Sequence, residues 1–132
     1  MAVKIKGITE EFNKIMKEYT DEVEKGVALA GTNVAKKTVK RLRKTSPKYK
    51  GKNGGSYAKG WRVTEIDGKN VIHNKTDYQL THLLENGHAK VNGGRVAARV
   101  HIRPAEEEAI NEYIKEVEKV IKRWHYKSLI IF

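Results

Sequence analysis

The sequence contains no cysteine, only two prolines and no long hydrophobic run. The absence of cysteine excludes a disulfide framework, thiolate metal sites and cysteine nucleophiles. The longest apolar run is far shorter than the roughly 20 residues that a membrane-spanning helix needs. No apolar block of a signal peptide occurs near the start, where acidic residues begin at Glu10. These absences predict a soluble protein that is made in a cytoplasm and has no membrane contact.

The net charge of +11 is concentrated in one segment. Residues from Lys36 to Arg62 include eleven Lys or Arg and no Asp or Glu, and the rest of the chain holds 16 basic and 16 acidic residues. Such a segment suits a polyanion, which is either a nucleic acid or the acidic face of a partner protein. The alternative is a solvated loop whose charges only keep the protein soluble.

A long helix is predicted over residues 8–44, where apolar residues recur mostly three or four positions apart. Thr9 is its expected N-cap, and Pro47 ends it because proline disfavours helical geometry in the preceding residue. An unbroken helix of this length reaches about 55 Å at 1.5 Å per residue. We therefore expect either a bend near Gly26 or Gly31 or one end that projects towards a partner.

The segment after this helix has the composition of a basic, flexible loop at 45–56 and then of strands. A first strand is predicted over Tyr57–Ile66 and a returning strand over Asn70–Asn74, joined by the hairpin turn signal Asp67–Gly68. A further short strand is predicted at Val100–Arg103.

Two more helices are predicted downstream. Thr76–Gln79 matches the capping box of a short helix, which Leu80, Leu83 and Leu84 anchor and which a left-handed cap at Gly87 ends. Pro104 suits the first turn of a final helix. The apolar stripe of that helix comprises Ile110, Ile114, Val117, Val120, Ile121 and Trp124. The apolar tail Ser128–Phe132 is either another strand or an anchor for a neighbouring subunit.

The predicted fold class is therefore α+β. An antiparallel sheet of about three to four strands packs with a long N-terminal helix, a short middle helix and a C-terminal helix. One domain covers residues 1–132, with the sheet, the two later helices and the apolar tail in 57–132.

No motif in the chain predicts catalysis or a cofactor. Gly26–Gly31 has the glycine spacing of a phosphate loop, but Thr32 stands where the lysine is required. The five histidines lack the spacing of a zinc site, and too few acidic residues surround His73–Asn74 for a metal nuclease. No nucleophile-elbow pattern occurs. We therefore expect a protein that is not an enzyme and that has no metal site and no cofactor.

Nucleic-acid binding without sequence preference is the alternative function. Tyr49, Tyr57 and Trp61 lie among the cations and are possible stacking platforms, although Trp61 is better explained as a core residue. No zinc-finger, RNA-recognition or KH signature occurs, so any contact would be to phosphates and would weaken with salt. The candidate residues facing DNA or a partner form a basic loop comprising Lys40, Arg41, Arg43, Lys44, Lys48, Lys50 and Lys52.

A series of landmarks begins at the first predicted strand. It runs through Tyr57–Trp61 (YAKGW), Val71–Asn74 (VIHN), Tyr78–His88 (YQLTHLLENGH), Gly93–Val96 (GGRV) and His101–Glu106 (HIRPAE). This order closely resembles the minor tail-component family of long-tailed double-stranded DNA phages and their prophages, whose members complete the tail or join it to the head.

The resemblance covers about residues 57–121 and implies a virion structural protein without catalytic residues. It implies an antiparallel sheet packed against a long first helix and a last helix, in a subunit of a homo-oligomeric ring, often of six. Its partners would be other head–tail connector or tail proteins, with non-specific contact to packaged DNA. The protein would be in the bacterial host cytoplasm during assembly and then in the virion. The motif residues expected to have structural roles are Trp61, Tyr78, His82, Leu83, Leu84, Glu85, Gly87, His88, His101 and Pro104.

Overall fold

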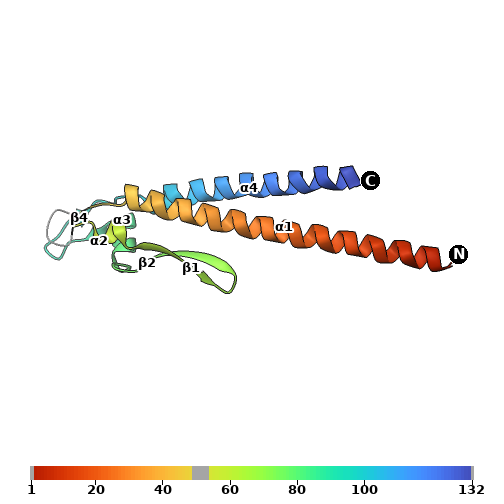
Figure 1. Ribbon diagram of the computed structural model, residues 1–132. Coiled ribbons are helices and arrows are strands. Elements are labelled where there is room, and N and C mark those ends of the chain that lie inside the picture. The colour runs from red at the N-terminus through yellow and green to blue at the C-terminus, as the bar shows by residue number, and fades with distance from the viewer. Residues whose placement is uncertain (1, 49–53, 132) are drawn as a thin grey trace. The chain divides into compact units, whose positions relative to one another are not determined.

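The computed structural model describes residues 2–48 and 54–131. Its elements, in chain order, are α1 (Ala2–Thr45), α2 (Ser56–Lys59), β1 (Trp61–Ile66), β2 (Lys69–Asn74), α3 (Leu80–Asn86), β3 (His88–Ala89), β4 (Arg95–Val96) and α4 (Ile102–Ile131) (Figure 1). This confirms the α+β class, with a long first helix, a short middle helix and a last helix. The described strands form two antiparallel two-stranded sheets, β1–β2 and β3–β4.

The chain divides into two compact units. A helix-pair unit comprises Met1–Ala30 and Tyr113–Phe132, and a mixed unit comprises Gly31–Glu112. The mixed unit contains both sheets, the short helices α2 and α3, and the motif residues of the sequence. The candidate site described below therefore lies within the mixed unit.

Helix α1 is longer than predicted and is continuous through Gly26 and Gly31. Thr9 lies inside the helix, so its assignment as N-cap is wrong. The C-terminal end is as predicted, because the helix stops at Thr45, two residues before Pro47. Of the predicted basic loop at 45–56, residues 49–53 lie outside the described residues, and Ser56 already belongs to α2.

In the helix-pair unit, the two helices approach closely at a glycine. A Cβ atom placed on Gly26 would lie 2.5 Å from Cγ1 of Val120, so any larger residue there would force one of the two to shift. Further along, the rings of Tyr19 and Trp124 meet edge to face, with centroids 5.9 Å apart. Gly26 thus allows the local contact that an alanine would hinder.

The predicted apolar stripe of α4 is only partly buried. Val120 is buried, and Val117 and Trp124 are half-buried. Ile110, Ile114 and Ile121 are 52%, 52% and 45% exposed, so half of the predicted apolar stripe does not lie in a core. The helix continues to Ile131, so the prediction of a further strand at the tail is wrong.

The first predicted strand begins four residues later than expected, because Tyr57 and Ala58 belong to the helical turn α2. Gly55 precedes this turn with a left-handed φ of 89°, a conformation that favours glycine. The turn places Tyr57 and Trp61 on the same side, with ring centroids 5.6 Å apart. Packing of both rings into one core therefore overrides the strand preference of an aromatic residue.

The hairpin is as predicted, and β2 is one residue longer than expected. Asp67 and Gly68 have φ values of 50° and 76°, which matches a two-residue turn with two positive φ angles. Trp61 pairs with Asn74 at the base of the hairpin, and Ile66 pairs with Lys69 at its tip.

Two predictions downstream of the hairpin are wrong. The capping box fails because α3 begins at Leu80 after Gln79, which makes no side-chain capping bond, while the Thr76 hydroxyl donates to the carbonyl of Ser56. The strand at Val100–Arg103 fails because α4 begins at Ile102, with Pro104 in its first turn as predicted. In both places a side chain bonds to a backbone group that is distant in sequence. Thr76 bonds to the carbonyl of Ser56, and Glu85 bonds to the N–H of Ile102.

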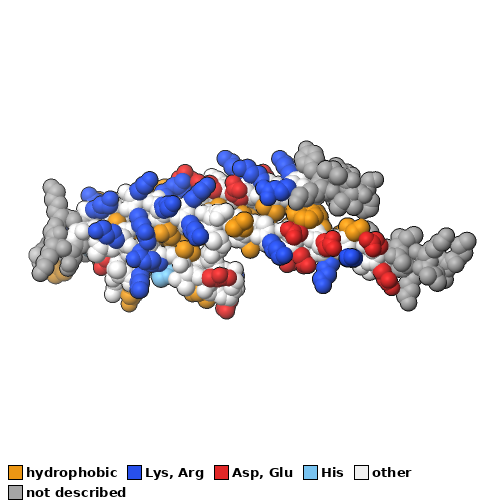
Figure 2. Space-filling model, viewed as in Figure 1, with side chains coloured by type: hydrophobic (Ala, Val, Ile, Leu, Met, Phe, Trp, Pro, Cys, Tyr) orange, Lys and Arg blue, Asp and Glu red, His pale blue; other side chains and the backbone are white. Residues whose placement is uncertain are grey.

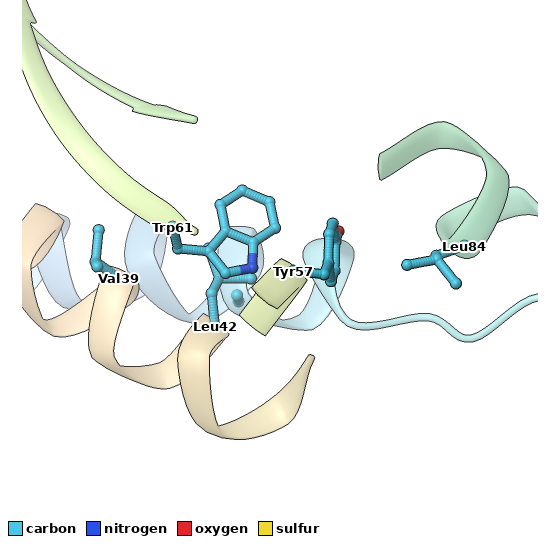
Figure 3. Close-up of a cluster of buried hydrophobic side chains, with 6 residues drawn as sticks. Val39, Leu42, Tyr57, Trp61 and Leu84 are labelled. Atoms are coloured by element: carbon cyan, nitrogen blue, oxygen red, sulfur yellow. The ribbon is translucent and has the colours of Figure 1, made fainter. Parts of the chain in front are cut away.

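The core of the mixed unit is small and aromatic. It comprises Val39, Leu42, Tyr57, Trp61, Leu84 and Ala105, and Figure 3 shows Tyr57 between Trp61 and Leu84. The assignment of Trp61 to the core is confirmed by its 4% exposure.

Candidate functional site

The carboxylate of Glu85 caps the N-terminus of α4 from another helix. It accepts hydrogen bonds from the backbone N–H groups of His101, Ile102 and Arg103, with a shortest distance of 2.8 Å at Ile102. The first N–H groups of a helix have no partner within the helix, and negative charge is favourable at that end. Glu85, near the end of α3, therefore fixes the start of α4.

His101 is a buried hydrogen-bonding centre beside this cap. Its Nδ1 lies 2.6 Å from the carbonyl oxygen of Arg99, which can only accept, so Nδ1 carries the proton. In the neutral ring, Nε2 then accepts the hydroxyl of Tyr57 at 2.7 Å. The Glu85 carboxylate lies 3.6 Å from Nδ1. His101 is thus buried and hydrogen-bonded beside the cap, and the sequence did not reveal that Tyr57 is its partner.

Gly87 allows the sharp turn between α3 and β3. Its φ of 73° and ψ of 175° lie in a region essentially reserved for glycine, and differ from the predicted left-handed cap in ψ. A Cβ atom there would lie 2.5 Å from the carbonyl oxygen of Val96. The close approach to the β4 strand therefore requires glycine at this position.

The other motif residues are divided between core and surface. Leu84 is buried and Leu80 packs against the core, whereas Leu83 is 42% exposed and is not the predicted anchor. Tyr78, His82 and Pro104 are exposed. His88 is half-buried, and its Nδ1 has no hydrogen-bond partner among the described residues.

Asn74 has a structural role that the sequence did not reveal. Its buried amide donates to the carbonyl of Tyr57 at 2.7 Å, and its Oδ1 accepts the N–H of Asp77 at 2.8 Å. The side chain therefore joins α2, β2 and the turn before α3. These hydrogen bonds explain why a polar side chain is buried at the end of β2.

The predicted basic residues differ in their surroundings. Lys40, Lys44 and Lys48 are exposed, while Lys50 and Lys52 lie outside the described residues. Arg41 forms ion pairs with Glu108 at 2.7 Å and with Glu112 at 3.2 Å. Arg43 donates from Nη2 to the carbonyl of Trp61 at 2.8 Å. The two arginines therefore form polar contacts within the unit.

Two general observations apply to residues 2–48 and 54–131. No group of three or more His, Asp or Glu residues lies close enough together to hold a metal ion. No helix among them is both long and apolar enough to cross a membrane.

Compared with protein-family models, curated proteins and solved structures, the chain matches none of them.

The Glu85 cap predicts a specific pH dependence of stability. Burial raises the pKa of this carboxyl, but the backbone hydrogen bonds from Ile102, His101 and Arg103 and the electrostatic interaction with His101 outweigh it, so the pKa lies below its usual value of 4.5. A carboxyl whose pKa is lower in the folded state stabilises the fold above its unfolded pKa, and this contribution is lost as the pH falls through the folded value. We expect the stability difference between wild type and Glu85→Gln to shrink as the pH falls below about 4.5.

Urea denaturation of both proteins between pH 3 and pH 7, followed by circular dichroism, measures this difference. Glu106→Gln, an exposed carboxyl early in the same helix, is the matched control. A wild-type advantage over Glu85→Gln that stays constant across this range would contradict the assignment.

Proposed function

We propose that this chain is a non-enzymatic structural subunit of a phage or prophage virion, which completes the tail or joins it to the head. The proposal is supported by what the residues of the resemblance motif do in the structure. Glu85, Gly87 and His101 are employed in a cap, a tight turn and a buried hydrogen bond. The motif therefore specifies how α3, the β3–β4 hairpin and α4 are held together, which supports a structural role for it.

The surface of α4 also supports a role in assembly. Within the helix-pair unit, Ile114 and Ile121 are 52% and 45% exposed and lie seven residues apart, on the same face of the helix. Exposed apolar surface of this kind marks contacts with other proteins when it forms a patch. A subunit that repeats one contact around an axis closes into a ring, the arrangement that the resemblance implies.

Interrupting the gene tests this proposal. Electron microscopy of particles from a phage or induced lysogen that carries the interrupted gene is expected to show separate heads and tails, or tails with aberrant ends. A wild-type copy supplied in trans should restore joined particles. Synonymous codon changes at the same position are the matched control for effects on neighbouring genes. Normal infectious particles from the interrupted gene would overturn the proposal.

A further inference from the structure

The last three turns of α1 in the mixed unit carry a lysine face, which we define as Lys36, Lys37, Lys40 and Lys44. All four side chains are exposed. With a rotation of about 100° per residue, they lie on one side of the helix. The buried residues Val34, Thr38 and Leu42 lie on the opposite side. The lysine face is therefore the part of the helix that is turned furthest from the core.

The two arginines in these turns lie at the borders of the buried side. Arg41 reaches Glu108 and Glu112, and Arg43 reaches the backbone of Trp61. Arginine suits such fixed, multiple contacts, whereas lysine is a flexible point charge. None of the four lysines has an ion pair within the described part of the chain. In these turns of α1, the arginines therefore have contacts within the protein, whereas the four lysines remain available to a ligand.

The surroundings of the lysine face reinforce its positive potential. The mixed unit contains 17 Lys or Arg and 8 Asp or Glu, and no acidic residue occurs between Lys36 and Arg62. In Figure 2, Lys and Arg side chains gather in the left half of the view, where Figure 1 shows the C-terminal end of α1, with few acidic side chains among them. A polyanion approaching this face would therefore meet little local repulsion.

We propose that the lysine face binds the phosphate backbone of double-stranded DNA without sequence preference. Lysines four residues apart on a helix are separated by about 6 Å along its axis, so the face is a row of charges. Duplex DNA presents one negative charge per roughly 1.7 Å of its axis, which lets such a row contact several phosphates. Cores of protein–protein interfaces are depleted in lysine and enriched in aromatic residues, so a face of lysines favours DNA over an acidic protein.

This inference rests on the proposed function for its setting, a subunit in a DNA-containing particle, but it is tested separately on the purified chain. Fluorescence anisotropy with a 30-base-pair duplex of mixed sequence measures the dissociation constant between 25 and 300 mM NaCl. If all four lysines contact phosphates, the logarithm of the binding constant falls with the logarithm of salt with a slope of about −3.6. The quadruple variant K36Q/K37Q/K40Q/K44Q should bind weakly and lose most of that slope.

A variant of equal net charge provides the matched control. Lys14, Lys17, Lys69 and Lys75 are also exposed, and changing all four to glutamine should leave most of the DNA affinity and slope intact. Circular dichroism measures whether both variants are folded.

Three outcomes would overturn the assignment. They are no binding by the wild type at 25 mM NaCl, an equal loss in both quadruple variants, and tighter binding of polyglutamate than of the duplex. None of them bears on the gene-interruption result, so failure here and failure of the proposed function are distinguishable.

Discussion

Replacing Trp61 by alanine is expected to lower the free energy of unfolding of the mixed unit by about 3–5 kcal/mol. The indole is 4% exposed and lies in the core with Val39 and Leu42. It also meets the rings of Tyr57 and His101 edge to face. Alanine removes these contacts and leaves a cavity that a core of six buried residues can fill only in part.

The hydrogen bond of the indole adds a smaller, separable contribution. Nε1 donates to the hydroxyl of Ser46 at 2.7 Å, and Ser46 is itself buried. Trp61→Phe retains much of the ring packing but removes this donor, so we expect a loss of about 1–2 kcal/mol. Trp61 thereby joins the end of α1 to the start of β1.

Urea denaturation followed by circular dichroism at 222 nm measures both variants. Leu83→Ala is the control, because this leucine is 42% exposed although the sequence predicted it as an anchor. It should cost far less, about 0.5 kcal/mol. Equal losses for Trp61→Ala and Leu83→Ala would show that the core is not centred on Trp61.

Replacing Glu85 by alanine is expected to destabilise the mixed unit by about 2–3 kcal/mol at pH 7. Three backbone N–H groups at the start of α4 lose an ionised acceptor. The side chain of Glu85 is 15% exposed, so water replaces it only in part. Glu85→Gln, which keeps one acceptor oxygen but no charge, should fall between alanine and wild type.

Glu106→Ala tests whether any carboxylate near the start of α4 would have the same effect. Glu106 is exposed and lies one turn further into the helix, so its loss should cost less than about 1 kcal/mol. If the Glu85 and Glu106 variants unfold at the same urea concentration, Glu85 is not the cap that holds α3 to α4.

The elements predicted correctly are those whose signals are local. The period of α1 extends over many turns, and its end at Thr45 follows from Pro47. The hairpin turn at Asp67–Gly68 requires two positive φ angles, which Asp-Gly adopts readily. Such features are determined within a few residues, so the sequence pattern is sufficient to find them.

The predictions that failed depend on contacts between distant residues. The start of α4 at Ile102 depends on Glu85, 17 residues earlier in the chain. Tyr57 was assigned to a strand because the local pattern does not show its contact with His101, which lies 44 residues further along the chain. Local propensity is a weak guide where tertiary contacts satisfy the backbone and bury the side chain.

For the candidate site, the sequence identified the residues better than their roles. The resemblance singled out Glu85, Gly87 and His101, but it did not reveal that Glu85 is a cap. The basic segment was also evident, whereas the separation of its arginines from its lysines was not. Arg41 is paired with Glu112, which lies 71 residues away, and no local pattern records that contact.

Structure determination of the head–tail junction would test whether this chain is a subunit of the virion. Electron cryomicroscopy of purified particles from a phage or induced lysogen that carries this gene would reveal whether the chain is a component of the virion. We expect copies of this chain in a closed ring at the junction or at the end of the tail. Particles that are complete, infectious and free of this chain would contradict it.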